Sequence, residues 1–429
     1  MMLTVYRWAT RFMGPAIYWH LIRRRARGKE DAARFKERLG HPGRARPEGP
    51  LVWIHAASVG ESLSVLPLIS ALLEAKPDLS VMVTTGTVTS ARLLGDRLPD
   101  RAFHHYVPVD RPRWVARFIE HWRPDLALWA ESEFWPNLVD QAERRGVPMV
   151  LINGRISDRS FERWQRFPRS IAQLLGGFSL CLGQSELDAE RLRVLGAKEA
   201  HCDGNLKYAS PPLPVDQAAL DDLRRSVADR PLWLAASTHP GEEAAVGRCH
   251  QALANQYPEV LTVVVPRHPE RGADAANDLT ANGLRVARRS LGEKPGPETQ
   301  IYMADTMGEL GLFFRLCPLV FIGKSLIGRG GQNPLEPARL GCAIVVGPHM
   351  GNFVTVTEDL IATGGCLSVD DEVMLAETIG RLLGDSNRVA EIGEAARREA
   401  QGKASVLPDI MHRLTPVLEA LGENGHAAS

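Results

Sequence analysis

Two acidic motifs in the first half of the chain carry side chains that could act on a proton or on a developing charge. The first is Ser58-Val59-Gly60-Glu61, which closely follows an apolar run through His55. A carboxylate at such a turn between a strand and a helix could face a cleft and remove a proton from an attacking hydroxyl. The Ser-x-x-Glu spacing is also that of a capping box, so the sequence alone leaves Glu61 as either a base or a cap.

The second acidic motif covers residues 129–137 and places Glu131 and Glu133 two residues apart after another apolar run. Two carboxylates at a strand end are costly to bury together, and such pairs often mark sites of shifted protonation. The equally good alternative is a solvated helix start, where acidic residues lie near the positive end of the helix dipole.

Two polar turns add further groups to this half of the chain. Asn153-Gly-Arg-Ile-Ser157 follows a predicted strand and could hold a polar ligand or form a simple turn. Lys207 ends Gly204-Asn-Leu-Lys207 just before a proline-rich stretch, and its ammonium could neutralise a phosphate or a carboxylate. A lysine in such a place is more often simply solvated, so neither turn decides a function by itself.

The second half of the chain is richer in groups that suit an anion. Hydroxyl, imidazole and guanidinium groups at helix N-termini favour a phosphate, and glycines let the backbone approach it closely. In the last of these motifs Asn333 suits a helix cap, Pro334 suits the first turn, and Glu336 could accept hydrogen bonds from a ribose. The motifs cover residues 237–242, 266–271, 305–310 and 323–338.

These motifs fall at the ends of apolar runs that predict strands. Short apolar runs alternate with amphipathic stretches such as 62–74, 89–98, 135–145 and 160–175, which predicts parallel sheets with helices on both faces. Ligands bind at the carboxyl ends of such strands. The predicted strands are 51–57, 80–85, 125–130, 148–152 and 178–182, then, beyond the proline-rich stretch, 232–236, 260–265, 319–322 and 343–346.

Length and charge narrow the class of protein. With 429 residues the chain is long enough for two domains, and 51 basic residues balance 51 acidic ones, which argues against a dedicated nucleic-acid binder. Residues 1–46 hold twelve Lys or Arg against three Asp or Glu, a net charge near +9. The six cysteines form no CxxC pair and fall mostly in apolar runs, so we expect reduced thiols in a cytosolic body.

The first 22 residues are apolar and aromatic but are interrupted by Arg7 and Arg11. The stretch free of Arg and Lys is about half of the roughly 20 residues that span a bilayer. Trp8, Phe12 and Trp19 lie near one helical stripe and a basic cluster follows, which predicts an interfacial amphipathic helix on an anionic membrane surface. An ordinary amphipathic helix packed on the protein body is the alternative.

Other ligand motifs fail on spacing. Gly323-Lys324-Ser325 looks like the end of a phosphate-binding P-loop, but the glycine required five residues earlier is Pro318. No GxGxxG follows the first predicted strand, which weakens a dinucleotide-dependent dehydrogenase, and no HExxH or other metal-ligand spacing occurs. We therefore expect neither a cofactor nor a metal.

Taken together and in this order, the motifs resemble those of the 3-deoxy-D-manno-octulosonic acid (Kdo) transferases, enzymes of lipopolysaccharide assembly in Gram-negative bacteria. The resemblance extends from the N-terminal segment to about residue 400. It implies an α/β protein of the GT-B fold, with two Rossmann-like parallel-sheet domains facing a central cleft and an N-terminal membrane-associated helix. The motifs are SVGE at 58–61, ESEFWPN at 131–137, NGRIS at 153–157, GNLK at 204–207, PRHPER at 266–271, DTMGEL at 305–310 and GGQNPLEP at 330–337.

The resemblance also implies roles for single residues. Glu61 matches the proton acceptor that deprotonates the acceptor sugar, which favours the base over the cap, and Glu131 and Lys207 match positions that stabilise the transition state. The implied reaction is inverting and metal-independent, and it moves Kdo from CMP-Kdo to a lipid A precursor (lipid IVA). The residues that match the CMP-holding segments are Pro266, Arg267, Met307, Gly308, Glu309, Asn333, Pro334, Leu335 and Glu336.

This interpretation divides the chain into five parts. Residues 1–46 form the amphipathic and basic membrane-associated segment, 47–208 the acceptor-binding domain, 209–217 a linker, 218–421 the CMP-sugar-binding domain and 422–429 a disordered tail. The protein is expected on the cytoplasmic face of the inner membrane, without a nucleic-acid partner. The alternatives are a GT-B transferase that uses another nucleotide sugar, a catalytically inactive peripheral membrane-binding module and, least favoured, a dinucleotide-dependent Rossmann enzyme.

Overall fold

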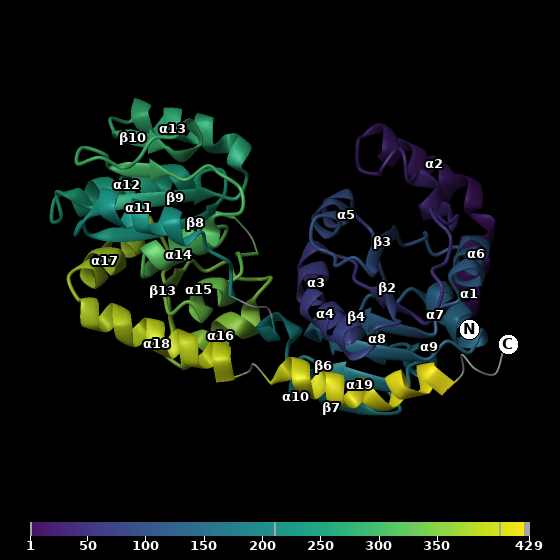
Figure 1. The fold of residues 1–429 in the computed structure, drawn as a ribbon. Helices are drawn as coiled ribbons and strands as arrows, with labels where there is room; N and C mark the ends of the chain where they lie inside the picture. Colours follow the sequence, from purple (N-terminus) through teal and green to yellow (C-terminus); the bar gives the residue numbers. More distant parts are fainter. Residues whose placement is uncertain (1, 210–211, 329, 403–404, 424–429) are drawn as a thin grey trace. The chain divides into compact units, whose positions relative to one another are not determined.

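The computed structural model describes residues 2–209, 212–328, 330–402 and 405–423. The chain divides into two compact units, one made of residues 1–210 with 405–429 and the other of residues 211–404. In each unit, helices surround a central sheet (Figure 1). The predicted pair of parallel sheets is therefore confirmed.

The sheet of the first unit has seven parallel strands within the described residues, in the order β3-β2-β1-β4-β5-β6-β7. Successive residues of β1 (Leu51–His55) pack into two different apolar clusters: Trp53 lies in one, and Val52 and Ile54 lie in the other. Both faces of the sheet are thus covered, which explains why the strand is a continuous apolar run. The other strands are β2 (Ser80–Thr85), β3 (Ala102–Tyr106), β4 (Leu126–Ala130), β5 (Met149–Gly154), β6 (Leu180–Gly183) and β7 (Ala200–Cys202).

Two prolines divide helices that were predicted as continuous. Pro67 and Pro168 lie in the first turns of α4 (Leu66–Ala75) and α9 (Pro168–Leu175), each of which follows another helix. A proline is tolerated in a first turn, but inside a continuous helix it would remove a hydrogen bond and clash with the preceding turn. The other helices on this sheet are α3 (Val59–Ser64), α5 (Val88–Gly95), α6 (Pro112–Trp122), α7 (Pro136–Arg144), α8 (Asp158–Gln165) and α10 (Glu186–Val194).

The second unit repeats this arrangement with the strand order β10-β11-β9-β8-β12-β13-β14 among its described residues. Its strands are β8 (Leu232–Thr238), β9 (Leu261–Pro266), β10 (Val286–Arg288), β11 (Ile301–Met303), β12 (Leu319–Ile322), β13 (Ala343–Val346) and β14 (Cys366–Ser368). Its helices are α11 (Gln217–Val227), α12 (Glu242–Ala254), α13 (Gly272–Ala281), α14 (Leu310–Leu316), α15 (Leu335–Arg339), α16 (Val354–Ala362), α17 (Glu372–Leu383) and α18 (Ser386–Gly402).

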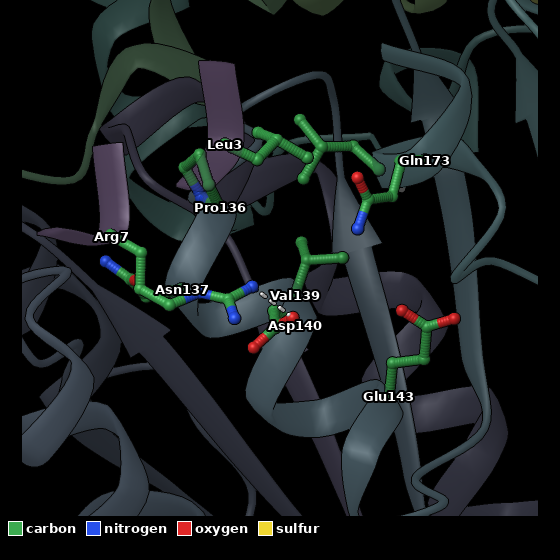
Figure 2. A pocket seen from close by; sticks show the side chains of 9 residues that line it. Leu3, Arg7, Pro136, Asn137, Val139, Asp140, Glu143 and Gln173 are labelled. Carbon is green, nitrogen blue, oxygen red and sulfur yellow. Dashed lines mark hydrogen bonds and ion pairs between the residues drawn. The ribbon is translucent and has the colours of Figure 1, made fainter. Parts of the chain in front are cut away.

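The N-terminal segment forms α1 (Met2–Phe12) and α2 (Gly14–Ala26) instead of one helix. One side of α1 packs on α7, where Arg7 donates a hydrogen bond to Asp140 at 2.6 Å beside a small pocket (Figure 2). The other side leaves Trp8 54% exposed. The segment is therefore both packed on the protein body and apolar on its free side.

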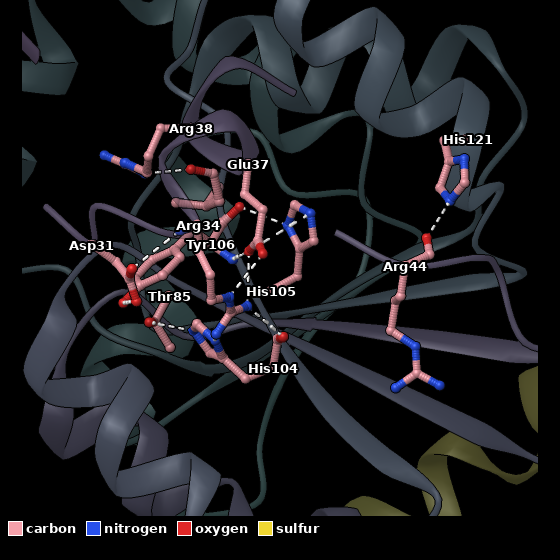
Figure 3. Close-up of polar contacts among 11 residues, drawn as sticks. Asp31, Arg34, Glu37, Arg38, Arg44, Thr85, His104, His105, Tyr106 and His121 are labelled. Carbon is pink, nitrogen blue, oxygen red and sulfur yellow. Dashed lines mark hydrogen bonds and ion pairs between the residues drawn. The ribbon is translucent and has the colours of Figure 1, made fainter. Parts of the chain in front are cut away.

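The strap, residues 27–46, follows these helices in the chain and is hydrogen-bonded to the edge strand β3 (Figure 3). The buried carboxylate of Glu30 accepts hydrogen bonds from Arg24 at 2.6 Å and from Arg38 at 3.2 Å. Arg34 donates to Glu37 at 2.7 Å and to the carbonyl of His104 at 2.8 Å. Buried charges are stable only when paired in this way, so the strap has a defined geometry.

The C-terminal helix α19 (Val406–Glu423) packs on the first unit. Ile410 and Leu414 are fully buried in the same apolar cluster as Ile54. The prediction assigned residues up to 421 to the CMP-sugar-binding domain, so the structure differs from it here. The physical reason is that the apolar stripe of α19 is buried against helices of the first sheet. The predicted tail, residues 422–429, begins inside α19, and its residues 424–429 lie outside the described part of the chain. Residues 210–211 of the predicted linker also lie outside it.

Candidate active site

Glu61 lies in the first turn of α3, which Ser58 caps. The Ser58 hydroxyl oxygen accepts a hydrogen bond from the Glu61 amide at 3.2 Å, and Oε2 of Glu61 accepts one from the Ala57 amide at 2.7 Å. Ser58 is therefore the N-cap that the spacing predicted, while the Glu61 carboxylate reaches the Ala57 amide, one residue before the amide that a standard capping box uses. Glu61 thus takes part in the cap, and its carboxyl group also has a hydrogen bond with the Ser58 side chain.

The pKa of Glu61 is raised from 4.5 to about 7. Burial is the main cause and the negative charge of Glu131 the second, while the hydrogen bonds from Ser58 and Ala57 oppose the shift. The residue is 6% exposed, so its charged form is poorly hydrated. A carboxyl group with a pKa near neutrality can both accept and release a proton at physiological pH, as a general base must.

Glu131 directly follows β4 and has a φ angle of 58°, in the left-handed region that residues other than glycine seldom adopt. Its amide donates to the carbonyl of Ile152 at 3.0 Å. Its carboxylate lies 3.4 Å from Nζ of Lys207, and both side chains are partly buried. Backbone strain of this kind persists where the surroundings enforce it, and it concentrates at functional sites.

The loop after Glu131 is fixed by its neighbours. The buried indole of Trp129 donates to the carbonyl of Glu133 at 2.9 Å, and the hydroxyl of Ser132 accepts from the amide of Arg155 at 3.1 Å. Burial, and next the charge of Glu131, raise the pKa of Glu133. The two carboxylates of the predicted motif, those of Glu131 and Glu133, therefore lie in a fixed loop between β4 and α7.

Three amide side chains connect the end of β5 with the turn that carries Lys207. Asn153 accepts a hydrogen bond from the Leu206 amide at 2.9 Å. Gln184 donates to the Asn153 carbonyl at 3.0 Å and accepts from Asn205 at 3.1 Å, and Asn205 in turn accepts from the Lys207 amide at 3.0 Å. The motifs at 153–157 and 204–207 thus meet, and Asn153 positions the lysine turn.

In the second unit, the buried carboxylate of Glu242 organises the loops that follow two central strands. It accepts hydrogen bonds from the amides of His239 at 2.9 Å, Lys324 at 2.6 Å and Leu326 at 3.1 Å. Ser237 and Lys324 have φ angles of 58° and 59°. Left-handed residues therefore lie at or directly after the carboxyl ends of central strands in both units, at the edge where parallel sheets bind ligands: Ser237 is the second-last residue of β8, and Lys324 comes two residues after β12.

Three of the predicted anion-binding motifs meet around this loop. Glu243 accepts hydrogen bonds from Arg271 at 3.0 and 3.3 Å. Nε2 of Gln332 lies 2.9 Å from Nε2 of His239. The amide of Arg267 donates to the carbonyl at the end of β8 at 3.0 Å, and its guanidinium is exposed. The motifs at 237–242, 266–271 and 323–338 thus form one surface.

The residues matched to CMP binding in the last motif lie at the start of α15. Asn333 accepts a hydrogen bond from the Leu335 amide at 3.1 Å and donates to Glu336 at 3.4 Å. Pro334 immediately precedes the helix. Asn333 therefore holds the turn that enters α15, but Pro334, and not Asn333 as the sequence predicted, is the N-cap residue of the helix.

The segment with Met307, Gly308 and Glu309 lies before α14 and is held differently. Arg289 donates to Glu309 at 2.6 Å, and the hydroxyl of Thr306 donates to the same carboxylate. The hydrogen bonds from Arg289 are the first cause of a lowered pKa at Glu309. The carboxylate of Glu309 is therefore already paired, whereas Met307 is 76% exposed.

Sequence reasoning missed Gln184 and Arg289, which belong to no predicted motif. Gln184 directly follows β6, and its position after a predicted strand was the only available indication. Arg289 follows β10, a strand of three residues that the apolar pattern does not reveal. Both hold other residues in place through hydrogen bonds across the sheet edge.

In the described part of the chain, no three or more His, Cys, Asp or Glu side chains come together as a metal-binding group. Nor does any helix in it combine the length and the apolar character that a bilayer span needs.

Comparisons with known proteins agree on one family. A family model described as 3-Deoxy-D-manno-octulosonic-acid transferase (kdotransferase) matches residues 33–210. The 3-deoxy-D-manno-octulosonic acid transferase of Haemophilus influenzae is 34% identical over 400 residues, which cover 90% of this chain and 92% of that protein. The Arabidopsis thaliana protein named "Probable 3-deoxy-D-manno-octulosonic acid transferase, mitochondrial" is 37% identical over 358 residues, which cover 81% of this chain and 80% of that one.

The fold is also shared with more distant solved structures. The UDP-GlcNAc 2-epimerase from Neisseria meningitidis bound to UDP-GlcNAc is 12% identical with a TM-score of 0.58, and the match covers 85% of this chain and 100% of that chain. At this identity the likeness concerns the fold alone. The near full-length matches to curated relatives carry the assignment: this chain belongs to the Kdo transferase family of glycosyltransferases and has its GT-B-like fold.

Proposed function

We propose that the protein is an inverting glycosyltransferase that moves Kdo from CMP-Kdo to a lipid A precursor. One observation carries the proposal. A buried carboxyl group with a pKa near neutrality, Glu61, lies within electrostatic reach of the Glu131–Lys207 ion pair at the ligand-binding edge of the first sheet. Membership of the family supports the choice of sugar.

On the acceptor side, Glu61 acts as the general base. An acceptor hydroxyl oxygen attacks the anomeric carbon of Kdo while its proton passes to the carboxylate of Glu61. The bond between that carbon and the phosphate oxygen breaks, and its electron pair leaves with CMP. Because the new bond forms opposite the one that breaks, the anomeric centre is inverted.

Glu131 and Lys207 stabilise the transition state. The anomeric carbon gains positive charge as CMP departs, and a fixed carboxylate nearby lowers the energy of that charge. Lys207 compensates the carboxylate and holds its position through the 3.4 Å ion pair. The strained backbone at Glu131 supports this role, since such strain concentrates at functional sites.

On the donor side, the second unit binds CMP. An exposed guanidinium, that of Arg267, stands at the end of β9, and arginine suits the phosphate that gains charge on departure. The Asn333 turn and the backbone before α14 would contact the rest of the nucleotide. The full proposed set is Pro266, Arg267, Met307, Gly308, Glu309, Asn333, Pro334, Leu335 and Glu336.

The N-terminal helices bring the enzyme to a lipid acceptor on the cytoplasmic surface of the inner membrane. Trp8 and Phe12 stack with ring centroids 5.3 Å apart and are 54% and 69% exposed. Trp19 is 56% exposed and carries the guanidinium of Arg23 3.5 Å from its ring centre. Exposed aromatic residues beside arginines suit the interface of an anionic bilayer.

A transfer assay tests the proposed reaction. Labelled Kdo is supplied as CMP-Kdo generated in the reaction, with a tetraacylated lipid A precursor in detergent as the acceptor. We expect transfer that CMP inhibits and that UDP and GDP leave unchanged. Failure of the folded protein to transfer Kdo, or inhibition by UDP instead of CMP, would contradict the proposed donor.

Flotation with vesicles tests the membrane contact separately. Wild type should float with vesicles that contain anionic lipid, and Trp8→Ser combined with Trp19→Ser should stay in the soluble fraction. Leu291→Ser is the matched control, because Leu291 is 63% exposed in the second unit and should not affect flotation. Equal flotation of the double variant and wild type would contradict the assignment of this surface.

A further inference from the structure

A polar pocket of about 230 Å³ lies beside the loop that carries Glu131. The residues after Glu131 form one wall, and the start of the next βα connection together with α8 forms the other. The loop is fixed on this side, because Ser132 accepts a hydrogen bond from the Arg155 amide at 3.1 Å. The lining residues are Ser132, Glu133, Phe134, Trp135, Arg155, Ile156, Ser160, Arg163 and Trp164.

Two guanidinium groups give the pocket its character. Arg155 comes from the end of β5, and Arg163 comes from α8, where it shares a helix face with Ser160 and Trp164. In the described part of the chain, neither arginine forms an ion pair with an acidic side chain. Glu133 is the one carboxylate among the lining residues, so two positive charges face one negative charge.

The pocket also has apolar walls. Trp135 is 38% exposed, and Phe134 and Trp164 line the same space. An aromatic ring presents an apolar face against which the carbon side of a sugar ring can pack, and hydroxyl and guanidinium groups supply directed polar contacts. The combination suits a phosphorylated sugar better than a free phosphate ion, because a free ion has no apolar surface to pack against the aromatic walls.

We infer that this pocket binds a phosphate group on the sugar headgroup of the acceptor, through Arg155 and Arg163. The inference rests on the proposed function, and it assigns the pocket to the acceptor because the lining residues continue directly from Glu131 in the unit that holds Glu61. A planar guanidinium can bind two phosphate oxygens at once, so the two arginines fix the orientation of the headgroup. They are positioning residues, because the new glycosidic bond forms near Glu61 and not at the pocket.

The test uses full-length protein and two matched lipid acceptors, one with and one without the sugar phosphate. Arg155→Gln and Arg163→Gln should each raise the KM for the phosphorylated acceptor about ten- to a hundred-fold, the usual loss for a hydrogen bond to a charged group. Their kcat and their KM for CMP-Kdo should stay near the wild-type values. For the acceptor without phosphate, wild type and variants should have similar KM values.

Arg159→Gln is the control for general loss of positive charge, because Arg159 is an exposed arginine on α8 that does not line the pocket. It should leave the KM unchanged, and Arg163→Lys should restore part of the affinity that Arg163→Gln loses. Inorganic phosphate separates a headgroup ligand from a free anion. If added phosphate changes the KM equally for both acceptors, the pocket binds the free ion and the inference is wrong.

The inference and the proposed function fail in distinguishable ways. If wild type transfers Kdo but Arg155→Gln and Arg163→Gln show unchanged KM for the phosphorylated acceptor, the inference is overturned and the proposed function stands. If folded wild type transfers Kdo to neither acceptor, the proposed function itself fails.

Discussion

The ammonium of Lys207 lies 3.4 Å from the carboxylate of Glu131, although Glu131 directly follows β4 and Lys207 lies in the short helical turn Leu206–Ala209 after β7. The left-handed backbone at Glu131 fixes one partner, and the amide chain through Gln184 and Asn205 fixes the other. An exposed ion pair would contribute little to stability. This one is partly buried and held from both sides, which is the arrangement expected where a charge must be aimed at a substrate.

Replacement of the lysine tests that role. Lys207→Met removes the ammonium, and we expect kcat to fall about a hundred-fold or more, the usual effect of losing a fixed charge at a transition state. Lys207→Arg keeps the charge and should retain part of the activity. The measurement is the initial rate of Kdo transfer, with circular dichroism melting to verify folding. A kcat near that of wild type in folded Lys207→Met would contradict the role.

The pH dependence of the rate reports on Glu61. A base with a pKa of about 7 is mostly protonated at pH 6, so kcat/KM should rise with pH through about 7 and then level off. The charge of Glu131 is the second cause of the raised pKa. Glu131→Gln should therefore move the rise of kcat/KM, the acidic limb of the pH profile, to lower pH, even though it also lowers the maximal rate.

Ser58→Ala should move the same limb in the opposite direction. The hydrogen bond associated with Ser58 lowers the pKa of Glu61, so its loss raises that pKa further. The variant also loses a helix cap, which costs about 1 kcal/mol of stability. Profiles of kcat/KM against pH for the two variants give the comparison, and shifts in the same direction would show that Glu61 does not set the limb.

Much of the fold was readable from the sequence. The central strands were predicted because each is buried on both faces and appears as an unbroken apolar run, as at β2 and β12. Strands nearer the edges were missed: β3 contains His104 and His105, and β7, β10, β11 and β14 have three residues each. Such strands are too short or too polar to stand out from loops.

The site was predicted unevenly. The motifs singled out Glu61, Glu131 and Lys207 as candidates, but spacing could not choose between a cap and a base at Glu61. The structure shows that Ser58 caps the helix and that Glu61 takes part in this cap. That α19 packs on the first unit was also beyond the sequence. Its apolar stripe predicts that one face of the helix is buried, but the pattern does not indicate which part of the protein covers that face.

The packing of α19 makes a prediction about stability. Leu414 is fully buried against the first unit, so Leu414→Ala should lower the free energy of unfolding by about 2–5 kcal/mol, although the residue lies near the chain's end. Glu419→Ala, an exposed change on the same helix, should stay within about 0.5 kcal/mol. Denaturant unfolding measures both, and equal stability of the two variants would contradict this packing.

The strap predicts loss of stability in acid. The pKa of His104 is lowered from 6.5 to about 3, first by burial and then by the charge of Arg34. Because this histidine is neutral in the fold and protonates more readily when unfolded, its contribution is complete above pH 6.5 and is lost as pH falls toward 3. Unfolding free energies measured between pH 7 and pH 5 should therefore decline.

The His104→Gln variant should decline less over this pH range, because an amide can keep hydrogen bonds to Arg34 and Thr85 without titrating. Replacement of the exposed His412 by Gln is the control and should decline as wild type does. If His104→Gln and wild type lose stability equally, the pH dependence arises elsewhere.

The most direct test of the account compares Kdo transfer by wild type and Glu61→Gln at pH 8. Glutamine can still accept the Ala57 hydrogen bond and so preserves the cap, but it cannot take a proton from the acceptor. The buried carboxylate has a raised pKa, so its contribution to stability is complete below pH 4.5 and is lost as pH rises through about 7. The uncharged variant should therefore melt no lower than wild type.

We predict that folded Glu61→Gln loses transfer by about a hundred-fold or more, in the range of general-base catalysis. That result would show that Glu61 acts as a base in addition to its role in the helix cap. Transfer at the wild-type rate by the folded variant would show that Glu61 is only a cap, and the proposed mechanism would be wrong.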